Sequence, residues 1–237
     1  ESLPSSSVQP AGVRDVRGPV LQDLNGDGYA DLAFTWRPCR RNCLYVIGEF
    51  STYLGSDTGL ATKPRRVIDF PREVELFVAA AGDVDGDGYA DLAVTAAYYQ
   101  RPVEILLFAG SSSGIRNQPT TLQQLPGGTL VPGGVRGAGD LNGDGYADLA
   151  VADMRGFMLD VDRVVLFPGG AGGLSTTPST IIEAEQGFND DFPPASSAGD
   201  VNGDGFDDLI VGAPRFSSGA PPAPVGRVYV FHGRPSL

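Results

Sequence analysis

A ten-residue acidic stretch occurs four times in the chain, and its spacing limits what the chain can fold into. It reads DLNGDGYADL from Asp23, DVDGDGYADL from Asp83, DLNGDGYADL from Asp140 and DVNGDGFDDL from Asp200. The copies begin 60, 57 and 60 residues apart. Self-similarity at a fixed period indicates that each repeat is one supersecondary unit, and that neighbouring units stack to bury a shared core. The sequence therefore predicts four copies of one unit in a single repeat domain, residues 1–237.

Short apolar runs follow each acidic stretch. The first runs are LAFTW, LAVTAAY, LAVADM and LIVGAP, and the second runs are CLYVIGEF, VEILLFAG, RVVLFPGG and RVYVFHG. They are rich in β-branched and aromatic residues and are bounded by Gly and Pro, which is typical of strands. A third run follows a Gly-rich turn, and a fourth precedes the acidic stretch, as in ELFVAAAGD. Four antiparallel strands in each repeat predict one blade of a β-propeller, so the expected fold is all-β with four blades in this chain.

The two ends of the chain match parts of one repeat. The last repeat stops at FHGRPSL, before its fourth strand, and the chain begins with ESLPSSSV, which resembles the missing piece. We therefore expect residues 1–12 to complete the last blade. This phasing fits a closed ring of four blades, one half of an eight-bladed dimer and a fragment of a larger propeller.

The acidic stretches have the composition of loops that bind a hard cation. Carboxylate or amide oxygens fall at positions 1, 3, 5 and 9 of each nine-residue loop, and Gly at positions 4 and 6 permits sharp turning. With a backbone carbonyl at position 7, this alternation suits Ca²⁺, which accepts flexible cages of many oxygens more readily than Mg²⁺ does. A solvated acidic turn needs only one or two Asp residues and has no reason to repeat this spacing. The loops differ from EF-hands, because position 12 is Phe or Val in every copy instead of Glu. They are residues 23–31, 83–91, 140–148 and 200–208.

These loops, with the sequence GAP at residues 212–214, resemble the FG-GAP repeats of integrin α-subunit β-propellers and their bacterial relatives. The resemblance spans essentially the whole chain and implies about four structural Ca²⁺ sites. The second loop has four carboxylates, and we expect it to bind most tightly; Asp207, beside the fourth site, is expected to point outward. The implied ligands, with each aromatic residue contributing its main-chain carbonyl, are Asp23, Asn25, Asp27, Tyr29 and Asp31; Asp83, Asp85, Asp87, Tyr89 and Asp91; Asp140, Asn142, Asp144, Tyr146 and Asp148; and Asp200, Asn202, Asp204, Phe206 and Asp208.

Charge and cysteine content restrict the partners and the compartment. The formal net charge of −12 argues against nucleic acid and against an anionic membrane surface as partners. No apolar run has the length needed to cross a bilayer. The two cysteines, Cys39 and Cys43, lie four residues apart; we favour a disulfide over free thiols, and a disulfide indicates an oxidising compartment. With the family resemblance, this predicts an extracellular or cell-surface protein.

A catalytic function is not expected. GSSSG at residues 110–114 matches the Gly-x-Ser-x-Gly pattern of a nucleophile elbow, but it aligns with GSDTG and GGAGG in other repeats, which indicates a turn between strands. His232 is the only histidine, and nothing in the sequence marks it as a base. The acidic loops account for the spacing of the remaining carboxylates.

The loops at the other end of each blade are the expected partner-binding face. Interfaces favour Trp, Tyr and Arg, and in integrin-like propellers the ligand side is opposite the calcium loops, as the resemblance implies. We expect an adhesion or protein-interaction module, with a carbohydrate-binding propeller lectin as the alternative, a homodimer as a further possibility, and solvated loops as the simplest reading of this face. The candidate residues are Trp36, Arg40, Arg41, Tyr98, Tyr99, Arg101, Arg155 and Arg215.

Overall fold

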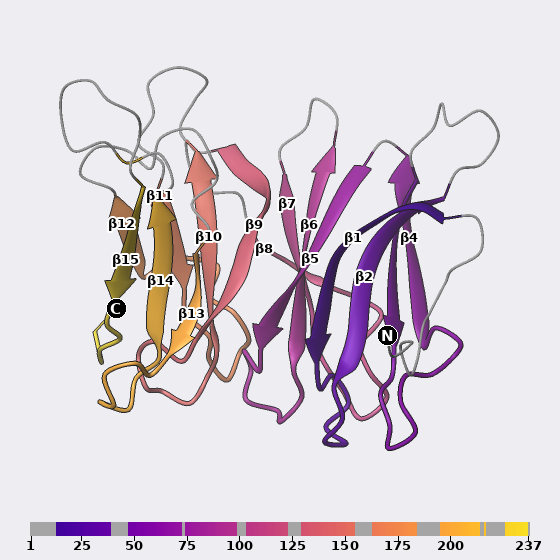
Figure 1. The fold of residues 1–237 in the computed structure, drawn as a ribbon, viewed down its shortest axis with the longest axis horizontal. Helices are drawn as coiled ribbons and strands as arrows, with labels where there is room; N and C mark the ends of the chain where they lie inside the picture. Colours follow the sequence, from indigo (N-terminus) through magenta and orange to yellow (C-terminus); the bar gives the residue numbers. More distant parts are fainter. Residues whose placement is uncertain are drawn as a thin grey trace, which may run out of the picture. The chain divides into compact units, whose positions relative to one another are not determined.

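The structure is a computed structural model that describes residues 13–38, 47–72, 74–98, 103–122, 129–154, 163–183, 195–213, 216 and 226–236. All regular elements within these ranges are β-strands, and all the sheets are antiparallel (Figure 1). The expected all-β class is therefore confirmed. No helix of the described part of the chain is long and apolar enough to cross a membrane.

The strands form four separate sheets, one for each acidic repeat. In the first sheet the order is β1 (Val13–Gln22), β2 (Asp31–Pro38), β3 (Ile47–Tyr53) and β4 (Arg66–Arg72). In the second it is β5 (Val74–Gly82), β6 (Asp91–Tyr98), β7 (Glu104–Phe108) and β8 (Thr120–Leu122). In the third it is β9 (Thr129–Gly139), β10 (Asp148–Met154), β11 (Arg163–Phe167) and β12 (Thr180–Glu183).

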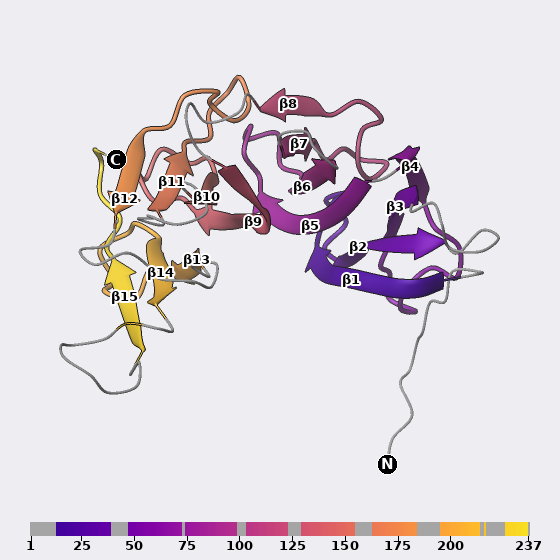
Figure 2. The same cartoon turned by 90° about the horizontal axis from the view of Figure 1, so that it is seen from above.

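The fourth sheet contains three strands within the described ranges. They are β13 (Ala195–Gly199), β14 (Asp208–Ala213) and β15 (Arg227–Phe231). Each sheet follows chain order, so strands that are consecutive within a repeat pair with each other, as in the blades of a propeller. Figure 2 shows this succession from β9 to β12. Residues 1–12, which we expected to supply a further strand here, lie outside the described residues.

Two compact units divide the chain. One consists of residues 1–80 and 88–122 and holds the first two sheets apart from the end of β5; the other consists of residues 81–87 and 123–237 and holds the last two. Each unit has its own core. Leu24, Phe50, Leu92 and Phe108 belong to the first core, and Leu141, Leu166, Leu209 and Val211 belong to the second.

Burial explains why the inner strands are almost continuously apolar. Every described side chain of β11 is buried, and four of the five in β7 are buried. A strand covered on both faces has no solvent-facing positions to fill with polar residues. The outer strand β12 alternates between half-buried and exposed positions, as a strand at the margin of a sheet does.

An aromatic ring from each of the last three repeats packs on a glycine in the loop of the repeat before it. A Cβ atom placed on Gly26, at position 4 of the first loop, would lie 3.0 Å from the ring of Tyr89. On Gly143 it would lie 2.5 Å from the ring of Phe206. Both glycines also have positive φ angles, so position 4 requires Gly for conformation and for space. Gly86 repeats the contact with the ring of Tyr146.

This packing predicts different costs for two substitutions in one loop. Gly143 and Gly145 both have positive φ, but nothing described lies within 4 Å of a Cβ on Gly145. Gly145→Ala should therefore lose only about 1 kcal/mol of unfolding free energy from backbone strain. Gly143→Ala should lose a further 1–3 kcal/mol, roughly, because the Cβ displaces the Phe206 ring. Urea unfolding measures both values, and equal losses would contradict the ring contact.

Candidate metal centres

Each acidic loop joins the first strand of its sheet to the second. The loop begins directly after β1, β5, β9 or β13, and its ninth residue is the first residue of β2, β6, β10 or β14. The sheet therefore holds both ends of the loop. Figure 1 shows β1 and β2 meeting at such a loop.

The carboxylate at position 1 organises the backbone of the loop. Oδ1 of Asp140 accepts hydrogen bonds from the N–H groups of Gly143 at 2.7 Å and Asp144 at 3.1 Å. Its Oδ2 accepts one from the N–H of Gly145 at 2.9 Å. Asp23 and Asp200 accept the same three bonds in their own loops. The peptide planes are thus turned toward one carboxylate, which folds the loop around it.

Positions 3 and 5 lie beside each other in the loop. The side-chain N–H of Asn142 donates to Oδ2 of Asp144 at 2.9 Å, while Oδ1 of Asn142 accepts from the backbone N–H of Asp144 at 2.9 Å. Asn25 and Asn202 make the same pairs with Asp27 and Asp204. The oxygens of these two positions therefore occupy one side of the loop.

The carboxylate at position 9 is buried and connects the loop to the rest of the sheet. The side chain of Asp31 is 0% exposed. Its Oδ2 accepts the backbone N–H of Leu24 at 2.9 Å, and its Oδ1 accepts the N–H of Gly55 at 2.7 Å. Gly55 begins the turn after β3. Asp148 and Asp208 make the corresponding pairs in the third and fourth repeats.

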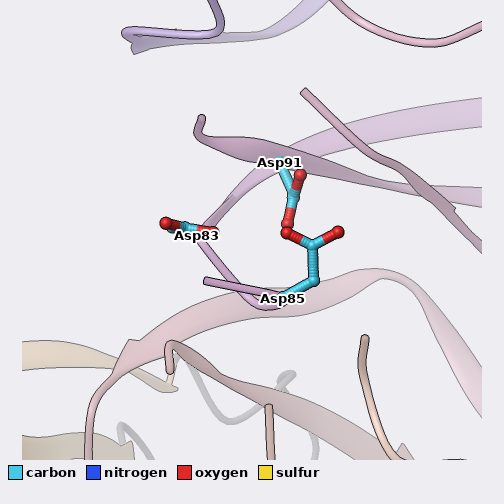
Figure 3. A group of neighbouring side chains, drawn as sticks. All are labelled: Asp83, Asp85 and Asp91. Atoms are coloured by element: carbon cyan, nitrogen blue, oxygen red, sulfur yellow. The ribbon is translucent and has the colours of Figure 1, made fainter. Parts of the chain in front are cut away.

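The second loop brings three acids together as a possible metal cluster. One ligand atom each of Asp83, Asp85 and Asp91 lies within 4.8 Å of the other two. Figure 3 shows the carboxylates of Asp85 and Asp91 turned toward each other, with Asp83 beside them. Within the described ranges this is the one such group of acidic, His or Cys ligand atoms; the other loops carry Asn at position 3. Asp87, also expected in this site, is not in the group.

The electrostatics of two position-9 carboxylates, Asp31 and Asp148, fit a cation. Burial raises the pKa of Asp148 to about 6, the N–H groups of Gly169 and Leu141 lower it, and the neighbouring carboxylates of Asp144 and Asp140 raise it again. Burial likewise raises the pKa of Asp31, and Asp27 and Asp23 add to this effect against two backbone hydrogen bonds. A buried carboxylate beside other carboxylates is stabilised in its charged form by a cation at hand. The donor set of carboxylates, amides and carbonyls suits a hard ion.

Comparisons with known proteins identify the repeat. A model of the FG-GAP-like repeat matches residues 83–151 and 140–211, which is more than half of the chain, and a model of the FG-GAP repeat matches residues 192–231. This chain belongs to the FG-GAP repeat family.

Integrin α-subunits are among the relatives of this FG-GAP chain. Integrin alpha-IIb of Mus musculus is 34% identical over 152 residues, covering 56% of the chain and 14% of the relative. Integrin alpha-PS2 of Drosophila melanogaster is 33% identical over 177 residues, covering 66% of the chain and 12% of the relative. Integrin alpha-PS5 of the same organism is 29% identical over 145 residues, covering 56% and 14%. The chain thus spans about a seventh of the length of these relatives. It is an integrin-like propeller module.

One side chain near the fourth FG-GAP loop, that of His232, was not assigned to the site by sequence reasoning. Nδ1 of His232 lies 3.2 Å from Oδ1 of Asp208 and 3.2 Å from the amide nitrogen of Asn202. Burial acts to raise the pKa of Asp208, but the N–H groups of Gly233 and Val201 and the His232 ring outweigh it and hold the pKa below its usual value. The matching residues in the other repeats are Leu54, Ala109 and Pro168, so no repeated pattern pointed to His232.

The prediction that Asp207 points outward is wrong. Its Oδ2 accepts the backbone N–H of Asp140 at 2.9 Å, so it faces the loop of the preceding repeat. Ala30, Ala90 and Ala147 occupy this position in the other repeats, and a methyl side chain has no oxygen to accept such a bond. The nearby positive-φ Gly139 leaves room for the carboxylate, because a Cβ there would overlap it.

The GSSSG segment is a turn between β7 and β8, as its alignment with the other Gly-rich turns predicted. The N–H of Gly114 donates to the carbonyl of Ser111 at 2.8 Å, which closes the turn. The strand-to-helix geometry of a nucleophile elbow is therefore not present at this segment.

The residues expected on the partner-binding face lie mostly outside the described ranges. Trp36 is described: its side chain is 9% exposed, packs with Phe34 and Tyr53, and donates its indole N–H to Ser51 at 2.9 Å. Trp36 is therefore almost fully buried and offers little surface to a partner. Tyr98 ends β6, at the opposite end of its sheet from the acidic loop. Outside the described ranges are Arg40, Arg41, Tyr99, Arg101, Arg155, Arg215, Cys39 and Cys43.

The raised pKa of Asp148 predicts a pH dependence in metal-free buffer. The folded protein holds this proton up to about pH 6, whereas the unfolded chain releases it near the ordinary aspartate pKa of 3.8. The contribution of Asp148 to stability is therefore greatest below pH 4, and it falls by about 3 kcal/mol as the pH rises through 6. Urea unfolding between pH 4 and pH 7 measures this slope.

Asp148→Asn should remove most of that slope, because the variant has no proton to release. Asp57→Asn, at an exposed turn position, is the matched control and should keep it. A slope of full size in Asp148→Asn would show that another group is responsible.

Proposed function

We propose that this chain is an extracellular, calcium-stabilised propeller module that binds a protein ligand. The observation that carries the calcium assignment is the cluster of Asp83, Asp85 and Asp91, whose ligand atoms lie within 4.8 Å of one another. Three carboxylates at this separation repel one another, and a divalent cation removes the repulsion. The oxygen-only donor set in a flexible loop favours Ca²⁺ over Mg²⁺, which demands near-ideal octahedral geometry.

The same proposal assigns one Ca²⁺ to each of the four loops. The first, third and fourth loops share one pattern of backbone hydrogen bonds to position 1, and position 9 is buried in all four. The ligands are the residues at positions 1, 3, 5 and 9 with the carbonyl of position 7. The second loop has an additional carboxylate at position 3, and it is the tightest site on this proposal, because affinity rises with ligand charge.

The proposed role of the ions is structural. The position-9 carboxylate already joins the loop to the turn after the third strand, as Asp31 joins Leu24 to Gly55. A cation at the loop adds the carboxylates of positions 1 and 5 to that connection. The residues of the loop therefore bind the ion. The ion connects the loop to the start of the second strand, and through the position-9 carboxylate to the turn after the third strand.

Removing calcium should lower the melting temperature of the chain. At about 1 mM free calcium and a dissociation constant of ~10 μM, each site stabilises the fold by about 2.7 kcal/mol. Excess EGTA should produce a large decrease, and added Ca²⁺ should reverse it, whereas Mg²⁺ at the same concentration should restore little. Differential scanning calorimetry measures the change. A melting temperature that is indifferent to EGTA would contradict the structural role.

The proposed ligand-binding face is at the end of each sheet away from the acidic loops. The second strand of every sheet starts at its acidic loop, so its far end, such as Tyr98 of β6, leads into that face. The integrin relatives support a protein ligand there. Tyr and Arg side chains often contribute much of the binding energy at interfaces. The sequence segments that follow the second strands contain Arg40, Arg41, Tyr99, Arg101, Arg155 and Arg215.

A direct binding experiment tests the ligand class. The calcium-loaded chain is immobilised and presented with a panel of extracellular matrix proteins and, separately, with a glycan array. Saturable binding to a protein is expected, and Ala at Arg40, Tyr98 and Tyr99 together should weaken it by at least about 100-fold. Ala at Lys63 and Arg116, exposed at the acidic-loop end, is the control and should leave it unchanged.

Two outcomes would contradict the proposed ligand or face. Binding that is confined to the glycan array would show that the chain is a lectin. Full affinity in the triple variant would place the binding site elsewhere.

A further inference from the structure

His232 places a ring nitrogen against two of the proposed ligands in the fourth acidic loop. Its Nδ1 lies 3.2 Å from Oδ1 of Asp208, at position 9, and 3.2 Å from the amide nitrogen of Asn202, at position 3. His232 is the only histidine of the sequence, so an imidazole accompanies this acidic loop alone. The residues in its place in the other repeats have no metal-binding side-chain atom; they are Leu54, Ala109 and Pro168.

The backbone on both sides of His232 is fixed within the fourth repeat. Phe231 precedes it and ends β15, which pairs with β14. Gly233 follows it and donates its N–H to Oδ1 of Asp208 at 3.0 Å. A Cβ on Gly233 would lie 2.3 Å from the carbonyl oxygen of Asp207, so the chain is packed closely at this point. The ring is therefore held beside the loop by the sheet and by the turn that follows it.

The orientation of the Asn202 amide is set by Asp204. The amide nitrogen donates to Oδ2 of Asp204 at 2.7 Å, and the amide oxygen accepts the backbone N–H of Asp204 at 3.0 Å. A half-turn of the amide would replace both bonds with contacts between like groups, oxygen against oxygen and N–H against N–H. The atom of Asn202 that faces His232 is therefore an N–H donor.

A single ring nitrogen does not satisfy both of its neighbours. As an N–H group, Nδ1 of His232 donates to the carboxylate of Asp208 but meets the N–H of Asn202. As a bare nitrogen it accepts from Asn202, but its lone pair then faces the negative oxygen of Asp208. A second proton on the ring leaves the first conflict in place. A metal ion resolves it, because the bare nitrogen and the carboxylate oxygen both donate lone pairs to the ion.

The separation between the nitrogen of His232 and the oxygen of Asp208, 3.2 Å, suits two ligands of one transition ion. Zn²⁺ binds imidazole nitrogen at about 2.0–2.1 Å and carboxylate oxygen at about 2.0–2.2 Å, which places two neighbouring ligands about 2.9–3.5 Å apart. Imidazole mixed with carboxylates suits Zn²⁺ and its first-row neighbours, whereas cages of oxygen alone suit Ca²⁺. The fourth loop therefore has donors for an ion that the other three loops do not favour.

We propose that the fourth loop is a mixed-ligand site that prefers a Zn²⁺-class ion over Ca²⁺, with Nδ1 of His232 and Oδ1 of Asp208 as two of its ligands. The structure brings these two atoms together as a pair, with the amide nitrogen of Asn202 between His232 and Asp204. The carboxylate of Asp204 is a third ligand, which the ion binds in place of that amide. This inference rests on the proposed role of the acidic loops as metal sites and assigns a second ion class to one of them.

Nuclear magnetic resonance of the single histidine tests this assignment. The full chain, prepared without added histidines and labelled with ¹⁵N, has one imidazole. With Ca²⁺ in excess, one equivalent of Zn²⁺ should shift the ¹⁵N signal of Nδ1 and leave a proton on Nε2, because a ligating ring nitrogen carries no proton. Titration calorimetry with Zn²⁺ in the same buffer should show one site for each chain.

His232→Gln should weaken this Zn²⁺ site by at least about 100-fold, because loss of a ligand costs no less than loss of a residue that only orients a ligand. Asp57→Asn, in an exposed turn of the first repeat, is the matched control and should keep the wild-type Zn²⁺ affinity. Circular dichroism and the melting temperature in Ca²⁺ show whether each variant is folded.

Three results would overturn the inference: ligation through Nε2, a ring that Zn²⁺ does not affect, or an equal Zn²⁺ affinity in folded His232→Gln. Calorimetric unfolding in Ca²⁺ and in EGTA separates this inference from the proposed function. Stabilisation by Ca²⁺ without ligation of Zn²⁺ by His232 would overturn only the mixed-ligand site. A chain that responds to neither ion would overturn both.

Discussion

The buried carboxylate at position 9 is the interaction on which each repeat depends. It accepts one N–H from its own loop and one from the turn after the third strand, as Asp31 does from Leu24 and Gly55. Such charge-assisted bonds in a buried place are strong, and they join segments that are far apart in the sequence. The cost is a buried negative charge beside other carboxylates, which is visible in the raised pKa of Asp148. The fold thus contains a buried carboxylate whose charged form a cation bound in the loop would stabilise.

Glycine at position 4 extends the connection from one repeat to the next. Because Gly143 has no Cβ, the ring of Phe206 packs directly on the loop backbone. The N–H of Asp207 then bonds the carbonyl of Asp140, and the N–H of Arg234 bonds that of Leu141. Stability in such an array is a sum of the stabilities of the repeats and of their shared interfaces. The loops are therefore part of the interface between repeats as well as candidate metal sites, which links metal binding to the association of one repeat with the next.

The elements of the fold followed from the sequence with few errors, because four copies of each signal support one another. Runs of β-branched and aromatic residues bounded by Gly and Pro predicted the strands, and the repeated turn at Gly110 correctly outweighed the isolated match to a nucleophile elbow. Asp207 was assigned wrongly because a solvated acid and an acid facing the next loop have the same local sequence. His232 was missed because its contacts with Asp208 and Asn202 cross about 24 to 30 residues and occur in one repeat only.

The sequence by itself determined the number of repeats, the strand content, the positions of the oxygen donors and membership of the FG-GAP family, since all of these are local patterns that recur. Only the tertiary structure decided which donors converge, with Asp83, Asp85 and Asp91 in one group, and which loop surfaces are covered. The reason is physical: a repeat pattern is a property of one unit, whereas burial and ligand distances depend on what packs against that unit. Leu141 is an example: its side chain is 1% exposed because the fourth repeat packs on the third loop, where the N–H of Arg234 bonds the Leu141 carbonyl.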